Sequence, residues 1–243
     1  MMRNVLHNQE VCSGEDYLFN RVVYEEGGEI YMADVDDMKV DPHTIIGNRI
    51  NKDDLYPKIS DFKDIKIFDG GNVFVKRPNL MYGSGQSMRK EINILEILDK
   101  NPNPHIVKYL GVLVQDDRIV GICLKKYKKT LRDAICNSVL FDKQKVMEDI
   151  NRAARHLHSM GYIHDDINPN NIMLDEGNRA VLIDFDSSKK IGDVREGKSG
   201  TYGWERKGDI ADIENDIYSI GLVKSYIHDF KPELTIQAQD IRL

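Results

Sequence analysis

The hydrophobic pattern along the chain changes from strand-like to helix-like at about residue 130. Before that point, residues 17–24 and 29–35 are apolar-rich segments separated by Glu-Glu-Gly-Gly, which predicts a β-hairpin. A second turn, Asp69-Gly70-Gly71, lies between the apolar segments 64–68 and 72–76. It predicts another hairpin, so the N-terminal part of the chain is expected to be rich in strands.

Three segments carry apolar residues at helical spacing, and the pattern predicts an amphipathic helix for each. They are residues 87–100, 141–161 and 215–227. The second of them ends at Gly161, a residue type that commonly terminates helices. Four further short apolar segments are expected to be strands. They are residues 105–114, 118–127, 171–175 and 180–185, the last two flanking an Glu-Gly-Asn turn.

Composition narrows the class of protein. Of the 243 residues, 41% are hydrophobic and 30% are charged, the balance of a globular protein. No apolar stretch approaches the roughly 20 residues that span a bilayer, and the first residues lack the apolar core of a signal peptide. We therefore expect an intracellular protein, cytoplasmic or nuclear, without a membrane partner. The net charge of −6 argues against nucleic acid as a partner.

The three cysteines, Cys12, Cys123 and Cys136, are isolated from one another along the chain. They show neither a Cys-x-x-Cys pair nor the spacing of a zinc site. The sequence therefore predicts reduced thiols without a metal-binding or disulfide role.

Four polar features follow one another in a fixed order. Lys76 closes an apolar strand, Glu91 lies on the next helix, residues 164–171 read His-Asp-Asp-Ile-Asn-Pro-Asn-Asn, and Asp184 ends a strand. Taken singly, each has a commonplace interpretation, such as a solvated lysine or a turn aspartate. Their joint order, on the expected element types, is far less commonplace than any one of them.

These features resemble the motifs of the protein kinase family, namely VAIK, the glutamate of the following helix, HRDxxxxN and DFG. The resemblance runs from about residue 64 to residue 228. It implies an α+β, two-lobed protein-kinase-like fold with a β-rich N-lobe and a truncated helical C-lobe. We expect residues 61–127 to form the N-lobe and residues 128–243 a short C-lobe. Residues 1–60 are expected to be an N-terminal extension that could belong to the N-lobe sheet.

The resemblance also assigns roles to individual residues. Phosphoryl transfer depends on positioning and charge neutralisation. Lys76 is expected to bind the ATP phosphates and Glu91 to orient it. Asp184 and the amide oxygen of Asn171 are expected to bind Mg²⁺, which prefers oxygen ligands. Asp166 is expected to accept the proton of the attacking hydroxyl, or to orient that hydroxyl, and Asn171 belongs with it and Lys76 among the catalytic residues.

Other residues are expected to bind adenine or to support the site. The segment around Lys125 and Tyr127, after the strand, corresponds to the family's hinge, whose backbone groups contact adenine. Lys125 is equally well interpreted as an ordinary charge at a strand end. His164 is expected to be structural, and Asp216 to accept backbone N–H groups of the loop that begins at His164.

The sequence departs from the family pattern at several positions. No GxGxxG loop precedes Lys76, which puts the grip on the phosphates in doubt; one of the two predicted hairpins could replace it. Asp165 occupies the position of the HRD arginine, which argues against activation by loop phosphorylation. Asn168 replaces a lysine of Ser/Thr kinases, and Asp186 replaces the DFG glycine.

The sequence is also similar to short fungal kinase-like proteins with HNDINP and DFD motifs. Two functions remain open. The first is an ATP- and Mg²⁺-dependent phosphotransferase acting on a hydroxyl of a protein Ser/Thr or of a small molecule. The second is a pseudokinase or interaction module that binds nucleotide without transferring phosphate. The short C-lobe resembles that of the small kinase of the KEOPS complex, so a protein partner is a further expectation.

Overall fold

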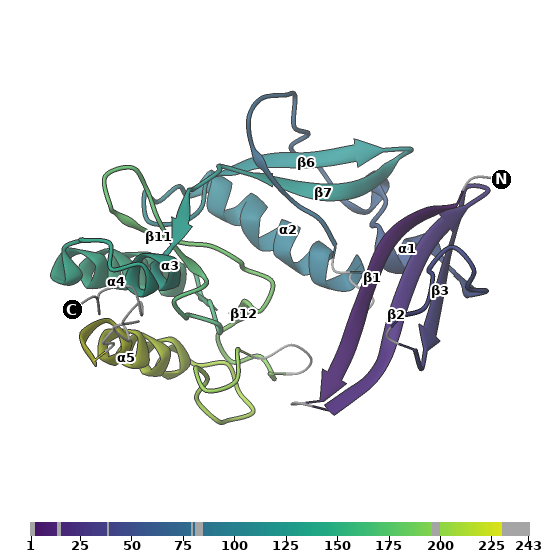
Figure 1. Cartoon of the computed structure of the whole chain (residues 1–243). Coiled ribbons are helices and arrows are strands. Elements are labelled where there is room, and N and C mark those ends of the chain that lie inside the picture. The colour runs from purple at the N-terminus through teal and green to yellow at the C-terminus, as the bar shows by residue number, and fades with distance from the viewer. Residues whose placement is uncertain are drawn as a thin grey trace, which may run out of the picture. The chain divides into compact units, whose positions relative to one another are not determined.

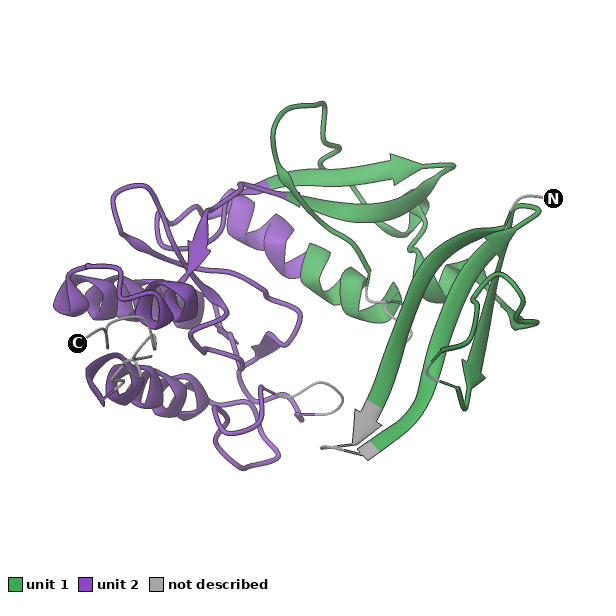
Figure 2. Ribbon diagram, viewed as in Figure 1, with its two compact units in different colours: residues 1–92, 110–123 green, residues 93–109, 124–243 purple. Residues whose placement is uncertain are grey.

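The computed structural model of the chain describes residues 3–13, 16–37, 39–78, 80, 85–195 and 200–229. Two compact units make up the chain, and Figure 2 colours them separately. Unit 1 comprises residues 1–92 and 110–123, and unit 2 comprises residues 93–109 and 124–243. Most of the strands lie in unit 1 and most of the helical residues lie in unit 2, which agrees with the predicted α+β class.

Unit 1 begins with an antiparallel sheet in the order β1-β2-β3-β4 (Figure 1). Its strands are β1 (Asn4–Ser13), β2 (Asp16–Glu26), β3 (Glu29–Val35) and β4 (Asn48–Ile50). Gly27 and Gly28 connect β2 to β3 with positive φ angles of 62° and 79°, which suits a tight hairpin turn. The first predicted hairpin is therefore confirmed, whereas the long and rather polar strand β1 was not predicted.

Both faces of this N-terminal sheet are covered. Val23 and Ile30 pack with Leu55 of the short helix α1 (Lys52–Leu55) in one cluster. Val22 and Tyr24 lie in a second cluster with Ile45. Because successive residues of a strand point to opposite faces, the two clusters lie on opposite sides of β2. Burial on both sides explains why Val22, Val23 and Tyr24 are consecutive apolar residues within an otherwise mixed strand.

A second sheet in unit 1 has the order β5-β7-β6. Its strands are β5 (Phe74–Lys76), β6 (Tyr109–Gln115) and β7 (Arg118–Leu124). Asp116 and Asp117 connect β6 to β7 with φ angles of 49° and 59°, as a two-residue hairpin turn requires. This sheet carries Lys76 at the end of β5.

The second predicted hairpin, around Gly70 and Gly71, is wrong. Ile67 forms a parallel bridge with Val112 of β6, and the Phe68 N–H donates to the Val112 carbonyl at 3.0 Å. The following strand β5 pairs with β7 instead. The two arms of the expected hairpin thus lie at opposite edges of the β6–β7 pair.

Gly111 provides the physical reason for this parallel pairing. Its φ angle is 122°, and a Cβ atom there would lie 2.7 Å from the Lys66 carbonyl oxygen and 2.8 Å from the Phe68 nitrogen. Only a glycine lets the segment around Ile67 approach β6 so closely.

Unit 2 is built around helices (Figure 1). They are α3 (Leu131–Cys136), α4 (Lys143–Ser159), α5 (Ile213–Asp229) and the second half of α2 (Gly85–Lys100), which begins in unit 1. α4 contacts the strand β11 and α5. Gly161, just beyond α4, has a φ angle of 79°, so the predicted helix end is confirmed.

Short strands of unit 2 flank the loop that begins at His164 and the segment that contains Asp184. They are β8 (Lys129–Thr130), β9 (Tyr162–Ile163), β10 (Ile172–Leu174), β11 (Ala180–Leu182) and β12 (Lys189–Lys190). β10 and β11 form the predicted antiparallel pair, with β8 on the other side of β10. β12 pairs with β9, which brings the chain after Asp184 back to the start of the loop that contains His164.

The cysteines whose side chains are described are free thiols. Cys123 is buried and Cys136 is exposed, while the side chain of Cys12 lies outside the described part. Burial raises the pKa of the Cys123 thiol, so it carries little reactive thiolate at neutral pH.

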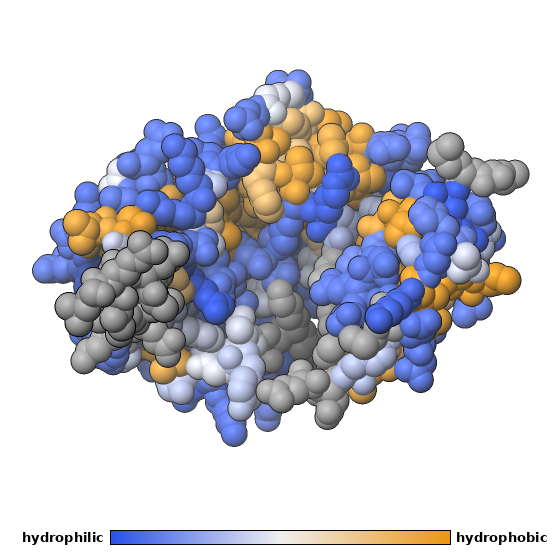
Figure 3. Space-filling view, viewed as in Figure 1, coloured by the Kyte–Doolittle hydropathy of each residue, from blue (hydrophilic) through white to orange (hydrophobic). Residues whose placement is uncertain are grey.

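The surface is mostly hydrophilic on the face shown in Figure 3, with hydrophobic side chains gathered over β6 and β7. Ile67 and Phe74, on segments that pair with these strands, are 55% and 51% exposed. In the part of the chain that the structure describes, no helix combines the length and apolar character needed to cross a membrane.

Replacing Gly111 with alanine tests the parallel pairing of Ile67 with β6. The added methyl group would meet the backbone of Lys66 and Phe68, so we expect the free energy of unfolding to fall by more than about 1 kcal/mol in urea titrations. Gly221→Ala is the matched control. Gly221 lies on α5 with open space around it, and alanine is expected to stabilise the helix by up to about 1 kcal/mol. Equal effects of the two substitutions would contradict the assigned pairing.

Candidate active site

In unit 1, Lys76 and Glu91 form a close ion pair. The Lys76 Nζ donates to both carboxylate oxygens of Glu91, at 2.8 and 2.7 Å. Glu91 is 2% exposed and lies on the same stripe of α2 as the buried Ile92 and Leu95. A charged residue on a buried helical stripe is costly unless it is paired. The structure thus brings together the lysine and glutamate that the sequence singled out.

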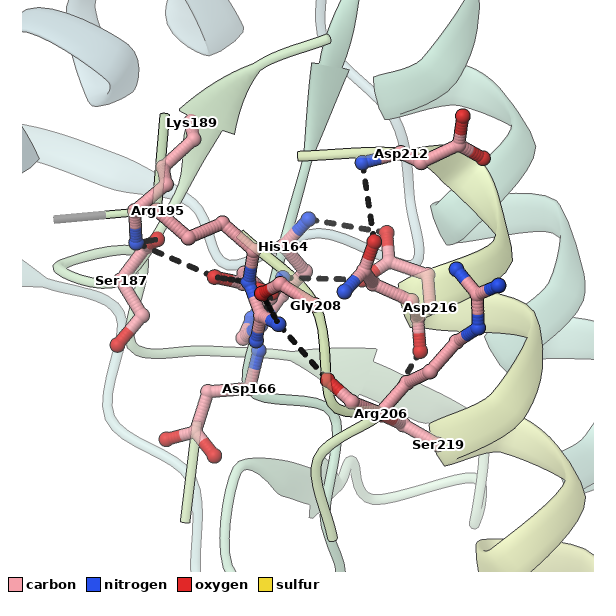
Figure 4. Close-up of polar contacts among 12 residues, drawn as sticks. His164, Asp166, Ser187, Lys189, Arg195, Arg206, Gly208, Asp212, Asp216 and Ser219 are labelled. Atoms are coloured by element: carbon pink, nitrogen blue, oxygen red, sulfur yellow. Dashed lines mark hydrogen bonds and ion pairs between the residues drawn. The ribbon is translucent and has the colours of Figure 1, made fainter. Parts of the chain in front are cut away.

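In unit 2, a buried carboxylate anchors the loop that begins at His164 (Figure 4). Asp216, on α5, is fully buried, and its two oxygens accept the N–H groups of His164 and Asp165, each at 2.9 Å. His158, at the end of α4, places its Nε2 2.7 Å from the same carboxylate. The expectation that Asp216 holds this turn through its backbone N–H groups is confirmed.

His164 fills a structural position. Its Nε2 lies 3.0 Å from the Ile183 carbonyl oxygen, and its ring packs against the buried Phe185 with centroids 4.8 Å apart. The imidazole therefore connects the loop to the chain on either side of Asp184, as expected of a structural histidine.

Asp166 is held by donors from two segments. Its Oδ1 accepts the backbone N–H of Thr201 at 2.7 Å and the side-chain amide of Asn168 at 2.9 Å. Its Oδ2 accepts the side-chain amide of Asn171 at 2.8 Å. A carboxylate offers about four lone-pair sites. Among the described residues three donors fill these sites and fix the orientation of the carboxylate, and one site is left for a donor such as a hydroxyl.

Asn171 and Asp184 both carry side-chain oxygen atoms, the type of ligand that Mg²⁺ prefers. Asn171 uses its amide nitrogen to donate to the carbonyl and the carboxylate of Asp166, at 3.0 and 2.8 Å. Because the amide nitrogen faces Asp166, the amide oxygen of Asn171 faces away from Asp166. It is a hard oxygen ligand, the type that Mg²⁺ prefers. The Ile183 N–H donates to the Asn171 carbonyl at 3.0 Å, which places Asp184 one residue further along the same ladder.

The described residues contain no cluster of three or more His, Cys, Asp and Glu side chains that could hold a metal. Asn171 and Asp184 would hold a magnesium ion together with water and substrate phosphates, which Mg²⁺ usually keeps among its ligands in proteins.

Lys125 and Tyr127 lie beyond the end of β7. The Lys125 N–H donates to the Lys108 carbonyl at 2.9 Å, and its ammonium group lies 5.4 Å from the centre of the Tyr127 ring. Both residues line a cavity of about 360 Å³ within unit 2. Burial raises the pKa of the Tyr127 phenol, so this side chain stays neutral at physiological pH.

Sequence reasoning missed the contacts made by the segment after Asp184. Gly200 is packed so closely that a Cβ atom would lie 2.7 Å from the Asp165 carbonyl oxygen, and Thr201 donates to Asp166. Arg195 and Lys189 both contact the Asp165 carboxylate. The only signal in the sequence was the replacement of the expected arginine by Asp165.

Removing the Asp216 carboxylate tests its role as the anchor. Asp216→Ala leaves two buried N–H groups without acceptors, so we expect the free energy of unfolding to fall by about 2–5 kcal/mol. Glu214→Ala, an exposed acid in the first turn of the same helix, is the control and should change it by less than about 1 kcal/mol. Urea denaturation of both variants measures the difference, and a wild-type stability for Asp216→Ala would refute the anchoring role.

Comparison with known proteins agrees with this geometry. The chain is 27% identical over 171 residues to a "Probable LIM domain-containing serine/threonine-protein kinase" of Dictyostelium discoideum, covering 65% of this chain and 26% of that protein. It is 27% identical over 198 residues to the human serine/threonine-protein kinase/endoribonuclease IRE2, and the match covers 70% of this chain and 21% of that protein. It is 30% identical over 115 residues to mitogen-activated protein kinase 15 of Caenorhabditis elegans, and the match covers 46% of this chain and 24% of that protein.

The chain thus spans about a quarter or less of the length of these relatives. A family model, the protein kinase domain, matches residues 72–235, which is more than half of the chain. That range contains Lys76, Glu91, Asp166, Asn171 and Asp184. The chain belongs to the protein kinase domain family.

Proposed function

We propose that this chain is an ATP- and Mg²⁺-dependent phosphotransferase that moves the γ-phosphate of ATP to a hydroxyl group. The observation that carries the proposal is the Asp166 carboxylate, oriented by three donors and joined to Asn171 through the amide nitrogen of that residue. This arrangement offers a base for the acceptor and an oxygen ligand for the metal in adjacent positions.

Each polar residue then has a separate task. Asp166 accepts the proton as the hydroxyl oxygen attacks the γ-phosphorus, the bond to the β-phosphate oxygen breaks, and ADP leaves. Lys76, held by Glu91, binds the phosphates as a point charge. Asn171 and Asp184 would hold Mg²⁺, which would supply positive charge that neutralises the phosphates. Lys125 and Tyr127 contribute to the adenine side of the site.

The acceptor is either a protein Ser/Thr or a small molecule. The relatives' names, which include serine/threonine-protein kinases, support a protein acceptor. Asn168 supports a small molecule, because the resemblance places a lysine there in Ser/Thr kinases. In this structure Asn168 instead donates to Asp166 and lies 3.2 Å from the Thr201 hydroxyl. An intracellular location, a fungal origin and a protein partner belong to the same proposal.

The alternative is a pseudokinase or interaction module that binds nucleotide without transferring phosphate. One observation favours it, namely that Asp166 is only 5% exposed and is covered in part by Thr201. If that cover is permanent, an acceptor hydroxyl has no route to the carboxylate. The absence of a GxGxxG sequence before Lys76 points the same way.

Thermal unfolding with and without Mg-ATP tests nucleotide binding. At 100-fold excess over the dissociation constant, linkage predicts about 2.7 kcal/mol of stabilisation, a melting shift of a few degrees. We expect the shift to require the metal and to disappear in Asp184→Ala. Asp193→Ala is the control, since Asp193 is an exposed acid on the same segment, and it should keep the full shift. A metal-independent shift, or one retained by Asp184→Ala, would argue against the assigned magnesium site.

Asp166→Asn separates the two functions. The amide keeps the shape of the side chain but cannot accept the proton, so phosphotransfer should fall by at least about a hundredfold while Mg-ATP binding stays near the wild-type value. Transfer from labelled ATP to generic protein substrates and to a panel of small hydroxyl compounds measures the rate. If the wild type transfers no more phosphate than Asp166→Asn does, the result favours the pseudokinase or interaction module over the phosphotransferase.

A further inference from the structure

The buried Asp165 carboxylate contacts two cations of unit 2, Lys189 and Arg195, both of which are labelled in Figure 4. Its side chain is 1% exposed, and it contacts the Lys189 ammonium at 3.1 Å. It also contacts Arg195 at two points, through Nε at 3.1 Å and through the terminal nitrogen at 2.9 Å. Both cations come from the chain that follows Asp184. Each of these charges would be costly to bury alone, so the buried carboxylate and its two cationic partners depend on one another.

Arg195 extends this contact to a third segment. Its side chain is 4% exposed, and its remaining guanidinium nitrogen donates to the carbonyls of Arg206 and Gly208, at 2.7 and 2.9 Å. Its backbone N–H donates to the Asp209 carbonyl at 2.7 Å. The planar guanidinium fork thus binds a carboxylate on one side and two carbonyls on the other, which a lysine could not do.

The segments that Arg195 joins are those that surround Asp166. Asp165 precedes Asp166 directly and has a left-handed φ angle of 62°, so its position sets the course of the backbone there. Gly200 packs on the Asp165 carbonyl, and Thr201 donates to the Asp166 carboxylate. The Trp204 N–H then bonds back to the Thr201 carbonyl at 2.9 Å, and the Trp204 carbonyl accepts the Ser219 hydroxyl at 2.7 Å.

We infer that Arg195 is a positioning residue for Asp166, and that Asp165 supplies the anion that keeps the segment after Asp184 in place without any phosphorylation. This inference rests on the proposed phosphotransferase function. Lys189 and Arg195, two cations of this segment, are already paired with the Asp165 carboxylate. Arg195 touches no reacting group; it acts through Asp165 and through the backbone of residues 206–209.

Three variants isolate this role in the full chain. Arg195→Met keeps the aliphatic stem but removes the fork, and Arg195→Lys keeps the charge but not the fork. Arg155→Met is the matched control, because Arg155 is exposed on α4. Hydrogen exchange of the Thr201 and Ala211 amides is measured first, since both N–H groups are bonded within the segments that Arg195 joins. The steady-state rate of phosphotransfer is measured second.

We expect Arg195→Met to accelerate exchange at Thr201 and Ala211 while the α4 amides exchange as in the wild type. We expect kcat to fall by about tenfold to a hundredfold with KM for ATP nearly unchanged, as for a displaced catalytic group. The exchange rates and kcat of Arg195→Lys should lie between those of Arg195→Met and the wild type. Arg155→Met should match the wild type in both measurements. Wild-type protein freed of phosphate by a phosphatase, with its mass checked, should keep both its exchange pattern and its kcat.

Wild-type exchange at Thr201 in Arg195→Met would overturn the inference whether or not the chain is active. A loss of Thr201 protection in the phosphatase-treated wild type would overturn it as well. If no form transfers phosphate, the proposed function fails, and the exchange measurements alone still decide whether Arg195 holds this segment.

Discussion

The buried carboxylate of Asp216 is the interaction on which the site in unit 2 depends. It comes from α5 and accepts the N–H groups of His164 and Asp165, with the His158 ring on its other side. Without an acceptor these two N–H groups would be buried and unsatisfied, and removing one member of a buried charged contact costs about 3–5 kcal/mol. The anchor therefore couples the stability of α5 to the course of the loop that leads to Asp166.

The loop and its surroundings bring several carboxylates close together, and each is stabilised by a different kind of donor. Asp216 is bonded to backbone N–H groups, Asp165 to a lysine and an arginine, and Asp166 to two side-chain amides and one backbone N–H. Each of the three carboxylates thus has its own set of donors, and none of these donors is shared between two of them. Among the described residues, the donors to Asp166 are two side-chain amides and one backbone N–H, all of them neutral groups.

Much of the fold and part of the site could be predicted from the sequence. Local signals sufficed for the β2–β3 hairpin and for α4 and α5, because turn residues and helical spacing act over a few residues. The order of Lys76, Glu91 and the loop containing Asp166 indicated the family, since each of these residues lies in a short motif that can be recognised from the sequence alone.

Other features depend on contacts between distant segments, which no local pattern encodes. The parallel pairing of Ile67 with β6 requires the missing side chain of Gly111, and the turn at Gly70 suggested a hairpin that the packing does not form. Arg195 meets Asp165 across 30 residues, and Thr201 meets Asp166 across 35. The presence of Asp165 in place of the family's arginine argued against activation by loop phosphorylation. Only the structure shows the two cationic partners of Asp165, which are Lys189 and Arg195.

A crystal structure of the chain with Mg²⁺ and a non-hydrolysable ATP analogue would test the central claim most directly. We expect a magnesium ion bound by the Asn171 amide oxygen and the Asp184 carboxylate at about 2.0–2.1 Å, with the remaining ligands supplied by phosphate and water. It also predicts that Lys76 contacts a phosphate oxygen. A nucleotide bound without metal at Asn171 and Asp184, or bound elsewhere on the chain, would contradict the account.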